Sequence, residues 1–408
     1  MAITYEGAID LTSQSNQFLH IYGPGAFDIY DAETLLMASL PKTFRHQGDS
    51  FNKTINLSFG GGRGYGSLPT PSQWLSRRIA FARKKAYYRG RIDREALYAS
   101  KGGGAVEELF KQVARLAPLS FRNMQECALF ADYATVANAV VGSGKLGTVT
   151  GVANADPIFT LTIANDFKAS NFEVGDLIQI ETGNADLFEI QTITPGVAPS
   201  GTIVVERVAG AQVPAPADEI FLQGSEDLAI LGLNSVCDFV AGDTLYGVAH
   251  QYRYAPTRVD CAGALTVAKM EEVVLGMGEM TGEGPDVIVM NREDWPTLTG
   301  LMEGDKRYDV TMPKREINGH MGFKGLTFVH PYGTSVVHLS RYCPRKRIYF
   351  INTNRWEMMH SQGFGWFQDS GSVFLTRPDD DELEVRYGGY MEMFFHAPTY
   401  FGLLYNIT

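Results

Sequence analysis

The chain has 408 residues, 45% of them hydrophobic, which is enough for two or three domains with sizeable cores. No apolar run reaches the ~18 residues that a membrane helix needs. The first residues also lack the basic start and apolar stretch of a secretory signal. We therefore expect a protein that stays in the cytoplasm at least until it assembles, with no membrane partner. The net charge is −11 at pH 7, and its distribution is uneven.

A basic segment lies between residues 45 and 94. It contains eleven Lys and Arg but only two Asp, a net charge of +9, which leaves −20 for the rest of the chain. Such a segment can bind nucleic acid, or it can dock on the acidic surface of another copy. The interleaved aromatic residues Phe81, Tyr87 and Tyr88 would fit base stacking. No nucleic-acid-binding signature accompanies them, so we favour the assembly interpretation.

Residues 1–44 have the pattern of an arm. They show no sustained hydrophobic period, although Asp31 can cap a short helix that Pro41 follows. Too few apolar residues are present for a separate core, so the arm must lie on another surface or be disordered. We expect it to gain its burial from sister copies.

Residues 45–92 predict a long β-hairpin. Alternation over residues 51–59 indicates a half-exposed strand, and a glycine-rich tip at residues 60–66 separates it from a basic and aromatic return. Fully extended, each arm would reach roughly 60 Å, whereas a compact chain of this length has a radius of gyration of about 22 Å. An isolated hairpin is marginal in water. We therefore expect it to project and pack on a neighbouring molecule.

Residues 93–145 form the strongest helical region. Apolar residues recur at three- and four-residue spacing from Val106 to Leu116, which predicts an amphipathic face. We expect Pro118 to interrupt or kink this helix and a second helical stretch to run over residues 121–132.

Residues 146–223 change character. Short β-rich runs recur every 10–15 residues or so, with Gly, Asn, Asp and Pro between them, which predicts a small barrel or sandwich. Mixed patterning resumes in residues 224–375, where Thr266 can cap a helix and residues 287–290 form a buried strand. Further strands are expected in residues 376–408. The β-rich segment is therefore expected to be an inserted domain.

The segment Gly142–Gly147 matches the dinucleotide pattern G-x-G-x-x-G. That chemistry needs a strand before the glycines and a helix after them. We predict the reverse order, a helix before and strands after. As a phosphate loop the segment also fails, because Ala139 replaces the first Gly and Leu146 the Ser or Thr. We interpret it as a linker.

No other pattern predicts catalysis or a cofactor. Eight histidines are scattered, and we expect His330 and His338 to be structural. The four cysteines form no zinc pattern and are expected to be buried reduced thiols. The acidic run Asp379–Glu382 favours a solvated turn over a metal site. No catalytic residue, cofactor or metal ligand is therefore predicted.

Taken in order, these parts resemble the major capsid proteins of tailed bacteriophages, with the Hong Kong ninety-seven-like fold. The matching features are an N-terminal arm, an extended loop, a helix beginning near residues 91–97, and the aromatic stretches Gly363–Phe367 and Tyr387–Tyr390. The resemblance implies an α+β fold with 93–145 as a peripheral domain with a spine helix, 224–375 as an axial domain, and 376–408 returning to the peripheral domain. The β-rich insert, 146–223, departs from the minimal pattern.

The resemblance further implies a structural protein and not an enzyme. Copies would form hexamers and pentamers that close into an icosahedral shell around double-stranded DNA, contacted non-specifically, and the protein would reside in the virion after assembly in the host cytoplasm. Scaffolding, portal and decoration proteins are further candidate partners. Lys53 would be the candidate donor if subunits were cross-linked as in some family members. The alternatives are an encapsulin-like nanocompartment, whose chains are usually shorter and without an inserted barrel, and a nucleotide-binding enzyme that uses Gly142–Gly147.

Contacts between subunits are expected to join basic residues of the hairpin region to the acidic run of a neighbour. The candidate contact residues are Arg63, Tyr65, Arg77, Arg78, Arg83, Lys84, Lys85, Asp379, Asp380 and Asp381.

Overall fold

The computed structural model describes residues 8–9, 36, 40–43, 50–58, 75–99, 109–136, 139–153, 156–164, 171–180, 186–194, 201–301, 326–368, 373, 375–376 and 381–407. The chain divides into two compact units. Unit 1 comprises Met1–Gln47, Arg83–Leu129 and Met358–Glu392, and unit 2 comprises Gly48–Ala82, Phe130–Glu357 and Met393–Thr408.

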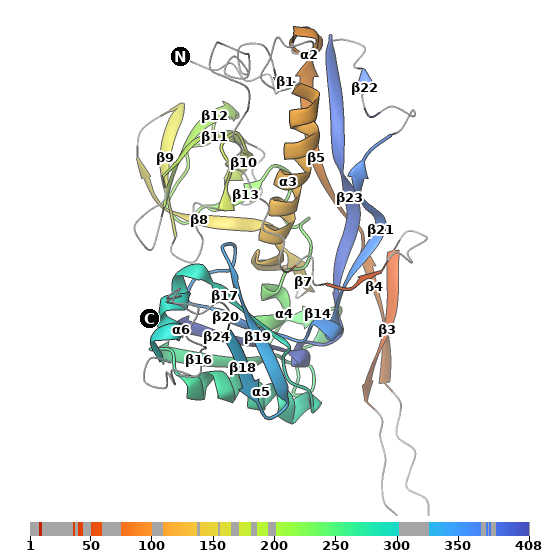
Figure 1. The fold of residues 1–408 in the computed structure, drawn as a ribbon, viewed down its shortest axis with the longest axis vertical. Helices are drawn as coiled ribbons and strands as arrows, with labels where there is room; N and C mark the ends of the chain where they lie inside the picture. The colour runs from red at the N-terminus through yellow and green to blue at the C-terminus, as the bar shows by residue number, and fades with distance from the viewer. Residues whose placement is uncertain are drawn as a thin grey trace, which may run out of the picture. The chain divides into compact units, whose positions relative to one another are not determined.

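Unit 1 is a mixed sheet with helices on one face (Figure 1). Its strand order is β1-β5-β23-β21-β2, and β22 pairs with β23. The strands are β1 (Ala8–Ile9), β2 (Lys42–Thr43), β5 (Lys84–Asp93), β21 (Trp356–Trp366), β22 (Leu375–Thr376) and β23 (Glu382–Phe395). Strands β5 and β23 pair antiparallel along all of β5, from Lys84↔Met391 to Asp93↔Glu382.

Helix α3 (Leu109–Leu129) lies along this sheet, and α2 (Arg94–Ala99) directly follows β5. Val113, Ala117 and Phe121 recur every four residues and are at most 6% exposed, so they form one helical stripe against the strands. Phe121 packs edge-on against Phe364 and Tyr387. Burial of such aromatic side chains is worth about 2–3 kcal/mol each, which favours a helix fixed to the sheet.

We expected Pro118 to interrupt or kink this helix. The interruption does not occur, because α3 runs through Pro118 without a break, and the second stretch expected over residues 121–132 is part of α3 as far as Leu129; the kink stays a prediction. Proline removes a backbone donor and costs roughly 3 kcal/mol inside a helix. The buried stripe lies on both sides of Pro118, with Ala117 and Phe121 adjacent to it. Tertiary burial of that stripe therefore outweighs the local cost.

The described part of the N-terminal arm is held by its own chain. Strand β1 pairs parallel with β5, and β2 pairs parallel with β21. Leu36 and Leu40 are 2% and 4% exposed, and the Leu36 amide donates to Glu126 Oε1 at 3.0 Å. The expectation that the arm gains its burial from sister copies was wrong for these residues.

The hairpin is shorter than predicted. In unit 2, β3 (Ser50–Ser58) pairs only with β4 (Leu75–Ala82), and the predicted tip lies outside the described residues. The return was expected to continue to residue 92. Instead, residues 84–93 form β5 and pair with β23 in unit 1. Local alternation predicts a strand but does not identify a partner 300 residues away.

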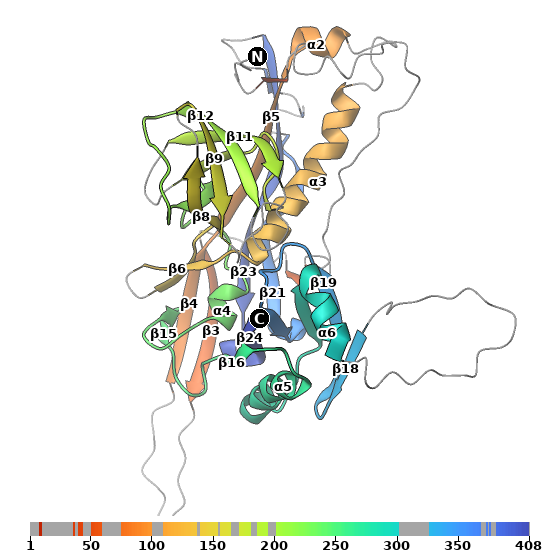
Figure 2. The same cartoon turned by 90° about the vertical axis from the view of Figure 1, so that its left-hand side faces the viewer.

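Unit 2 contains a closed six-stranded barrel of order β10-β11-β12-β9-β8-β13, whose strands wrap around one another in Figure 2. It is built from β8 (Lys145–Ala153), β9 (Ile158–Ile163), β10 (Leu177–Ile180), β11 (Leu187–Thr194), β12 (Thr202–Ala209) and β13 (Glu219–Leu222). Alternate residues such as Leu161, Ile163, Ile203 and Val205 are 0% exposed and fill its interior. The predicted all-β insertion is therefore confirmed.

A second part of unit 2 is a six-stranded sheet of order β16-β24-β20-β17-β19-β18. Its elements are β16 (Thr257–Gly263), α5 (Val267–Thr281), β17 (Val287–Asn291), η3 (Arg292–Asp294), α6 (Trp295–Leu301), β18 (Leu326–His330), β19 (Gly333–Ser340), β20 (Ile348–Ile351), η5 (Thr353–Arg355), η6 (Pro398–Tyr400) and β24 (Phe401–Ile407). Helix α5 covers one face and buries Met270, Val273 and Met277. Thr266 caps α5, as predicted, by accepting from the Lys269 amide.

A four-stranded sheet completes unit 2, with order β15-β14-β7-β6. Its strands and the neighbouring short helix are β6 (Tyr133–Val136), β7 (Ala139–Gly142), β14 (Thr244–Leu245), β15 (Val248–Ala249) and α4 (Asn234–Cys237). Within the described ranges, no helix is both long enough and apolar enough to span a membrane.

Candidate assembly surfaces

The hairpin presents basic side chains on β4. Arg77 and Arg78 are exposed, whereas the next residue, Ile79, is 2% exposed. The Arg77 guanidinium donates to the Gly247 carbonyl in the turn between β14 and β15. Part of the basic surface is therefore held against its own unit, while Arg78 stays accessible to solvent.

An ionic cluster anchors the hairpin base. The ammonium group of Lys53 pairs with Glu357 and lies 4.2 Å from the ring centre of Phe394. His396 Nε2 lies 3.4 Å from the same Glu357 oxygen. Burial lowers the pKa of Lys53. Burial, with smaller contributions from the charges of Lys53 and Arg355, lowers the pKa of His396, so its neutral form is favoured.

A second ionic group lies on the face of the β5–β23 ladder. Glu384 Oε2 accepts from Arg89 Nη2 at 2.6 Å, and Glu384 Oε1 accepts from Arg386 Nε at 2.6 Å. The hydrogen bond from Arg89 is the main cause that lowers the pKa of Glu384 to about 2; burial opposes it and Arg386 adds to it. This carboxylate therefore stays ionised at neutral pH and holds two guanidinium groups.

The remaining candidate contact residues fall into three groups. Arg83 donates to Ser361 Oγ at 3.4 Å, while Lys84 and Lys85 lie opposite Met391 and Tyr390. Asp381 pairs with Arg94 of its own chain at 2.9 Å. Residues Arg63, Tyr65, Asp379 and Asp380 lie outside the described residues. Within unit 1, the described end of the acidic run therefore lies at the start of α2.

The sequence analysis missed the β23 residues Glu384, Arg386 and Tyr390, which share the sheet with β5. Their signal was the alternation of charged and apolar residues from Glu382 to Tyr387, the period of a half-exposed strand. That pattern predicts a strand, but it does not predict that the strand pairs with β5.

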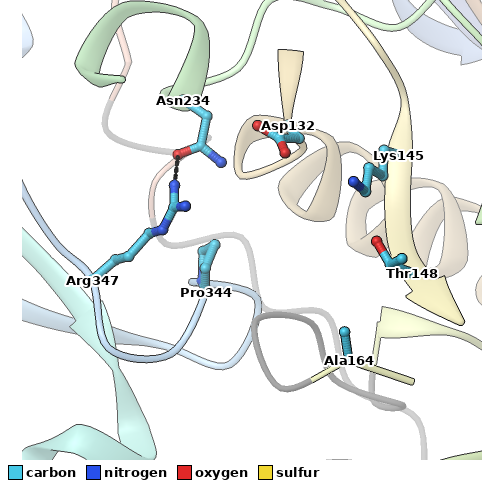
Figure 3. Close-up of a pocket in the computed structure, with 7 residues that line it drawn as sticks. All are labelled: Asp132, Lys145, Thr148, Ala164, Asn234, Pro344 and Arg347. Atoms are coloured by element: carbon cyan, nitrogen blue, oxygen red, sulfur yellow. Dashed lines mark hydrogen bonds between the residues drawn. The ribbon is translucent and has the colours of Figure 1, made fainter. Parts of the chain in front are cut away.

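A small polar cavity of about 90 Å³ lies in unit 2 (Figure 3). It is lined by Asp132, Lys145, Thr148, Ala164, Asn234, Pro344 and Arg347. The Asn234 side-chain oxygen accepts from Arg347 Nη1 at 3.3 Å and from the Tyr349 hydroxyl at 2.6 Å. Burial raises the pKa of Asp132, opposed by Lys145. The cavity has room for only a few water molecules. Its two cationic groups are paired with carboxylates outside the lining, Lys145 with Glu219 and Arg347 with Asp238.

The segment Gly142–Gly147 is not a nucleotide loop. Strand β7 precedes it and strand β8 follows it, so no helix N-terminus faces a phosphate. The predicted helix before the glycines was wrong, because α3 ends at Leu129 and two strands intervene. A Cβ on Gly142 would lie 2.4 Å from the Ile230 carbonyl oxygen, and Gly144 has φ +73°. These glycines serve a tight strand-to-strand turn.

No described residues form a metal site. Across the described ranges, no group of three or more His, Cys, Asp and Glu is placed to hold an ion. His330 Nε2 lies within hydrogen-bonding distance of the Pro285 carbonyl and Ser335 Oγ, a structural role. All four cysteines are buried, as predicted.

Comparison with known proteins gives a fold and no sequence relative. No protein-family model and no curated protein matches the chain. A capsid subunit of cyanophage A-1(L) superposes with a TM-score of 0.54 at 11% identity, over 95% of this chain and 97% of that chain. The capsid of an empty GTA particle superposes with a TM-score of 0.51 at 9% identity, over 96% of this chain and 95% of that chain. The SrpI encapsulin of Synechococcus elongatus PCC 7942 superposes with a TM-score of 0.46 at 8% identity, over 100% of this chain and 96% of that chain.

The chain therefore has the capsid-subunit fold, which confirms the expected architecture. It is an α+β protein of the Hong Kong ninety-seven-like type, with a closed β-barrel in addition to the minimal elements. Both chains are covered almost completely in the two best superpositions named, so the similarity extends over the whole architecture and not over a single domain.

Proposed function

We propose that the chain is a major capsid protein that assembles with copies of itself into hexamers and pentamers. These close into an icosahedral shell that encloses double-stranded DNA, so the protein resides in the virion after assembly in the host cytoplasm. The observation that carries the proposal is the end-to-end similarity to two capsid subunits. A fold by itself does not fix function, so the proposal needs a direct test.

The exposed chemistry agrees with a structural role. Charged and aromatic side chains such as Arg78 and Tyr87 are exposed on extended strands, where a neighbour can cover them. Among the described residues, the small cavity detailed above holds Lys145 as an ion pair with Glu219, so this amine is not a free base, which gives no support to an enzyme. Nucleotide chemistry at Gly142–Gly147 is disfavoured by the strand-turn-strand geometry.

The test is electron microscopy of the full chain expressed alone and with its neighbouring phage genes, with light scattering on the same samples. We expect closed particles or rings of megadalton mass. A stable monomer under every condition would refute the proposal. Scaffolding, portal and decoration proteins, if they are partners, would appear in particles from the co-expressed sample.

An encapsulin-like compartment is the second candidate, and the particle contents separate the two. Nuclease-protected double-stranded DNA in particles from infected cells supports the capsid. A protein cargo with no DNA supports the compartment. Contacts with packaged DNA would be non-specific and electrostatic, so we expect them to weaken with salt.

A further inference from the structure

On the side of β5 that faces away from α3, side chains of the described part of the unit 1 sheet are exposed. Strand β5 alternates, so that Lys85, Tyr87 and Arg89 are exposed while Gly90 and Ile92 are buried. The buried set packs with α3, and the exposed set faces the other way. We define the aromatic–basic face as Lys85, Tyr87, Arg89, Phe367, Arg386 and Tyr390.

Aromatic rings form the centre of this face. The ring centres of Tyr87 and Phe367 lie 5.6 Å apart, those of Tyr87 and Tyr390 6.1 Å, and those of Phe367 and Tyr390 6.0 Å. Tyr87 is 44% exposed although it is a large hydrophobic side chain. Phe367 and Tyr390 are partly exposed. Tyr and Phe clustered in this way beside Arg match the composition of a protein–protein interface centre.

The charges around the rings are unbalanced. Arg89 lies directly opposite Arg386, and their side chains are 51% and 44% exposed. Like charges directly opposite each other in a strand pair are destabilising. Among the described residues, the Glu384 carboxylate accepts hydrogen bonds from both arginines. With Lys85 exposed nearby, the face carries excess positive charge, which an acidic partner would balance.

We propose that the aromatic–basic face docks on the barrel of a second copy of this chain, an inference that rests on the proposed shell function. The barrel, Lys145–Leu222, contains ten Asp and Glu but only three Lys and Arg, a net charge of −7. It also exposes apolar side chains, including Val174 at 65% and Val213 at 61%. The barrel thus offers both negative charge and apolar surface, the complement of the face.

Two other occupants fit less well. The hairpin of a neighbour exposes Arg77 and Arg78, so its charge repels a basic face. Packaged DNA would match the positive charge of the face, but a closed duplex offers no free base surfaces to the three rings. The acidic barrel is therefore the occupant that the charges and the rings together favour.

Zero-length carbodiimide cross-linking of assembled particles tests the proposal. Isotopically light and heavy full-length chains are mixed before assembly, and cross-linked peptides are identified by mass spectrometry. We expect Lys85 to be joined to an Asp or Glu within residues 145–222, with light–heavy pairs present. The proposal would be overturned if Lys85 formed no cross-links, or formed them only within one chain or only to acidic residues outside 145–222. It would also be overturned if Lys85 were protected only in DNA-filled particles.

Two variants add a functional readout. Lys85→Glu and Tyr87→Ala should each raise the protein concentration needed for assembly by about tenfold, the size expected for loss of a central interface side chain. Arg253→Glu reverses an exposed charge in unit 2 and serves as the matched control. If the wild type forms shells and both variants assemble at the wild-type concentration, the docking proposal is refuted but the proposed capsid function is not. Failure of the wild type to form shells would refute both.

Discussion

Replacing Glu384 with Gln removes the negative charge that the two guanidinium groups on the β5–β23 ladder share. The carboxylate is 3% exposed, and each of its oxygens accepts a 2.6 Å hydrogen bond. A carboxyl group whose pKa falls from 4.5 to about 2 on folding stabilises the native state by about 3 kcal/mol at neutral pH. Both arginines are about half exposed, so water screens the pairs, and we expect a loss of about 1–2 kcal/mol.

The same carboxyl group predicts the acid behaviour of unit 1. Because its folded pKa lies below its unfolded value, its contribution is fully present above about pH 4.5 and is lost as the pH falls through about 2. The wild type should therefore lose more stability between pH 6 and 2.5 than Glu384→Gln does.

Hydrogen exchange of the β5–β23 amides measures this sheet separately from unit 2. Glu382→Gln is the matched control, because the ion pair of Glu382 with Arg91 spans 3.9 Å and its removal should cost less. If the β5–β23 amides exchanged equally slowly in Glu384→Gln and wild type at pH 7, the stabilising role of the carboxylate would be refuted. Equal loss of stability in acid by the two proteins would refute it as well.

Three further changes test other parts of the fold. Burial raises the pKa of Asp176 in the barrel to about 7, so the stability of the barrel should fall as the pH rises from about 4 to 7; Asp176→Asn should abolish that fall, as followed by pH-dependent amide exchange. Thr266→Ala removes the cap of α5 and should cost about 1 kcal/mol in denaturant unfolding, whereas Thr266→Ser should cost little. Gly388→Ala would put a Cβ 2.2 Å from the Ala86 carbonyl oxygen and should cost on the order of 2–4 kcal/mol, measured by thermal unfolding. Gly365→Ala, where a Cβ meets nothing within 4 Å, should be close to neutral.

Local patterns predicted some of the elements of the chain. The cap at Thr266, the buried strand at residues 287–290 and the β-rich insert depend on residue period and capping chemistry, which neighbouring residues determine. The predicted interruption of the helix at Pro118 does not occur, because a buried helical stripe outweighs the local cost of the proline. The prediction also failed for the arm, where Leu36 and Leu40 are buried on the same chain.

The candidate surface was also predicted only in part. Sequence identified Lys85 and Arg83 as basic residues on an extended segment, because charge and alternation are properties of the segment itself. It did not identify Glu384 and Arg386, since their nearness to β5 depends on strand pairing across nearly 300 residues.

The sequence by itself determined the period of each strand and helix, the basic character of residues 45–94 and the acidity of the barrel. Only the tertiary structure decided which strands became neighbours and which side chains of β5 are exposed. The physical reason is that period and charge are set within a few residues, whereas pairing is set by the burial that the whole chain achieves when distant segments meet.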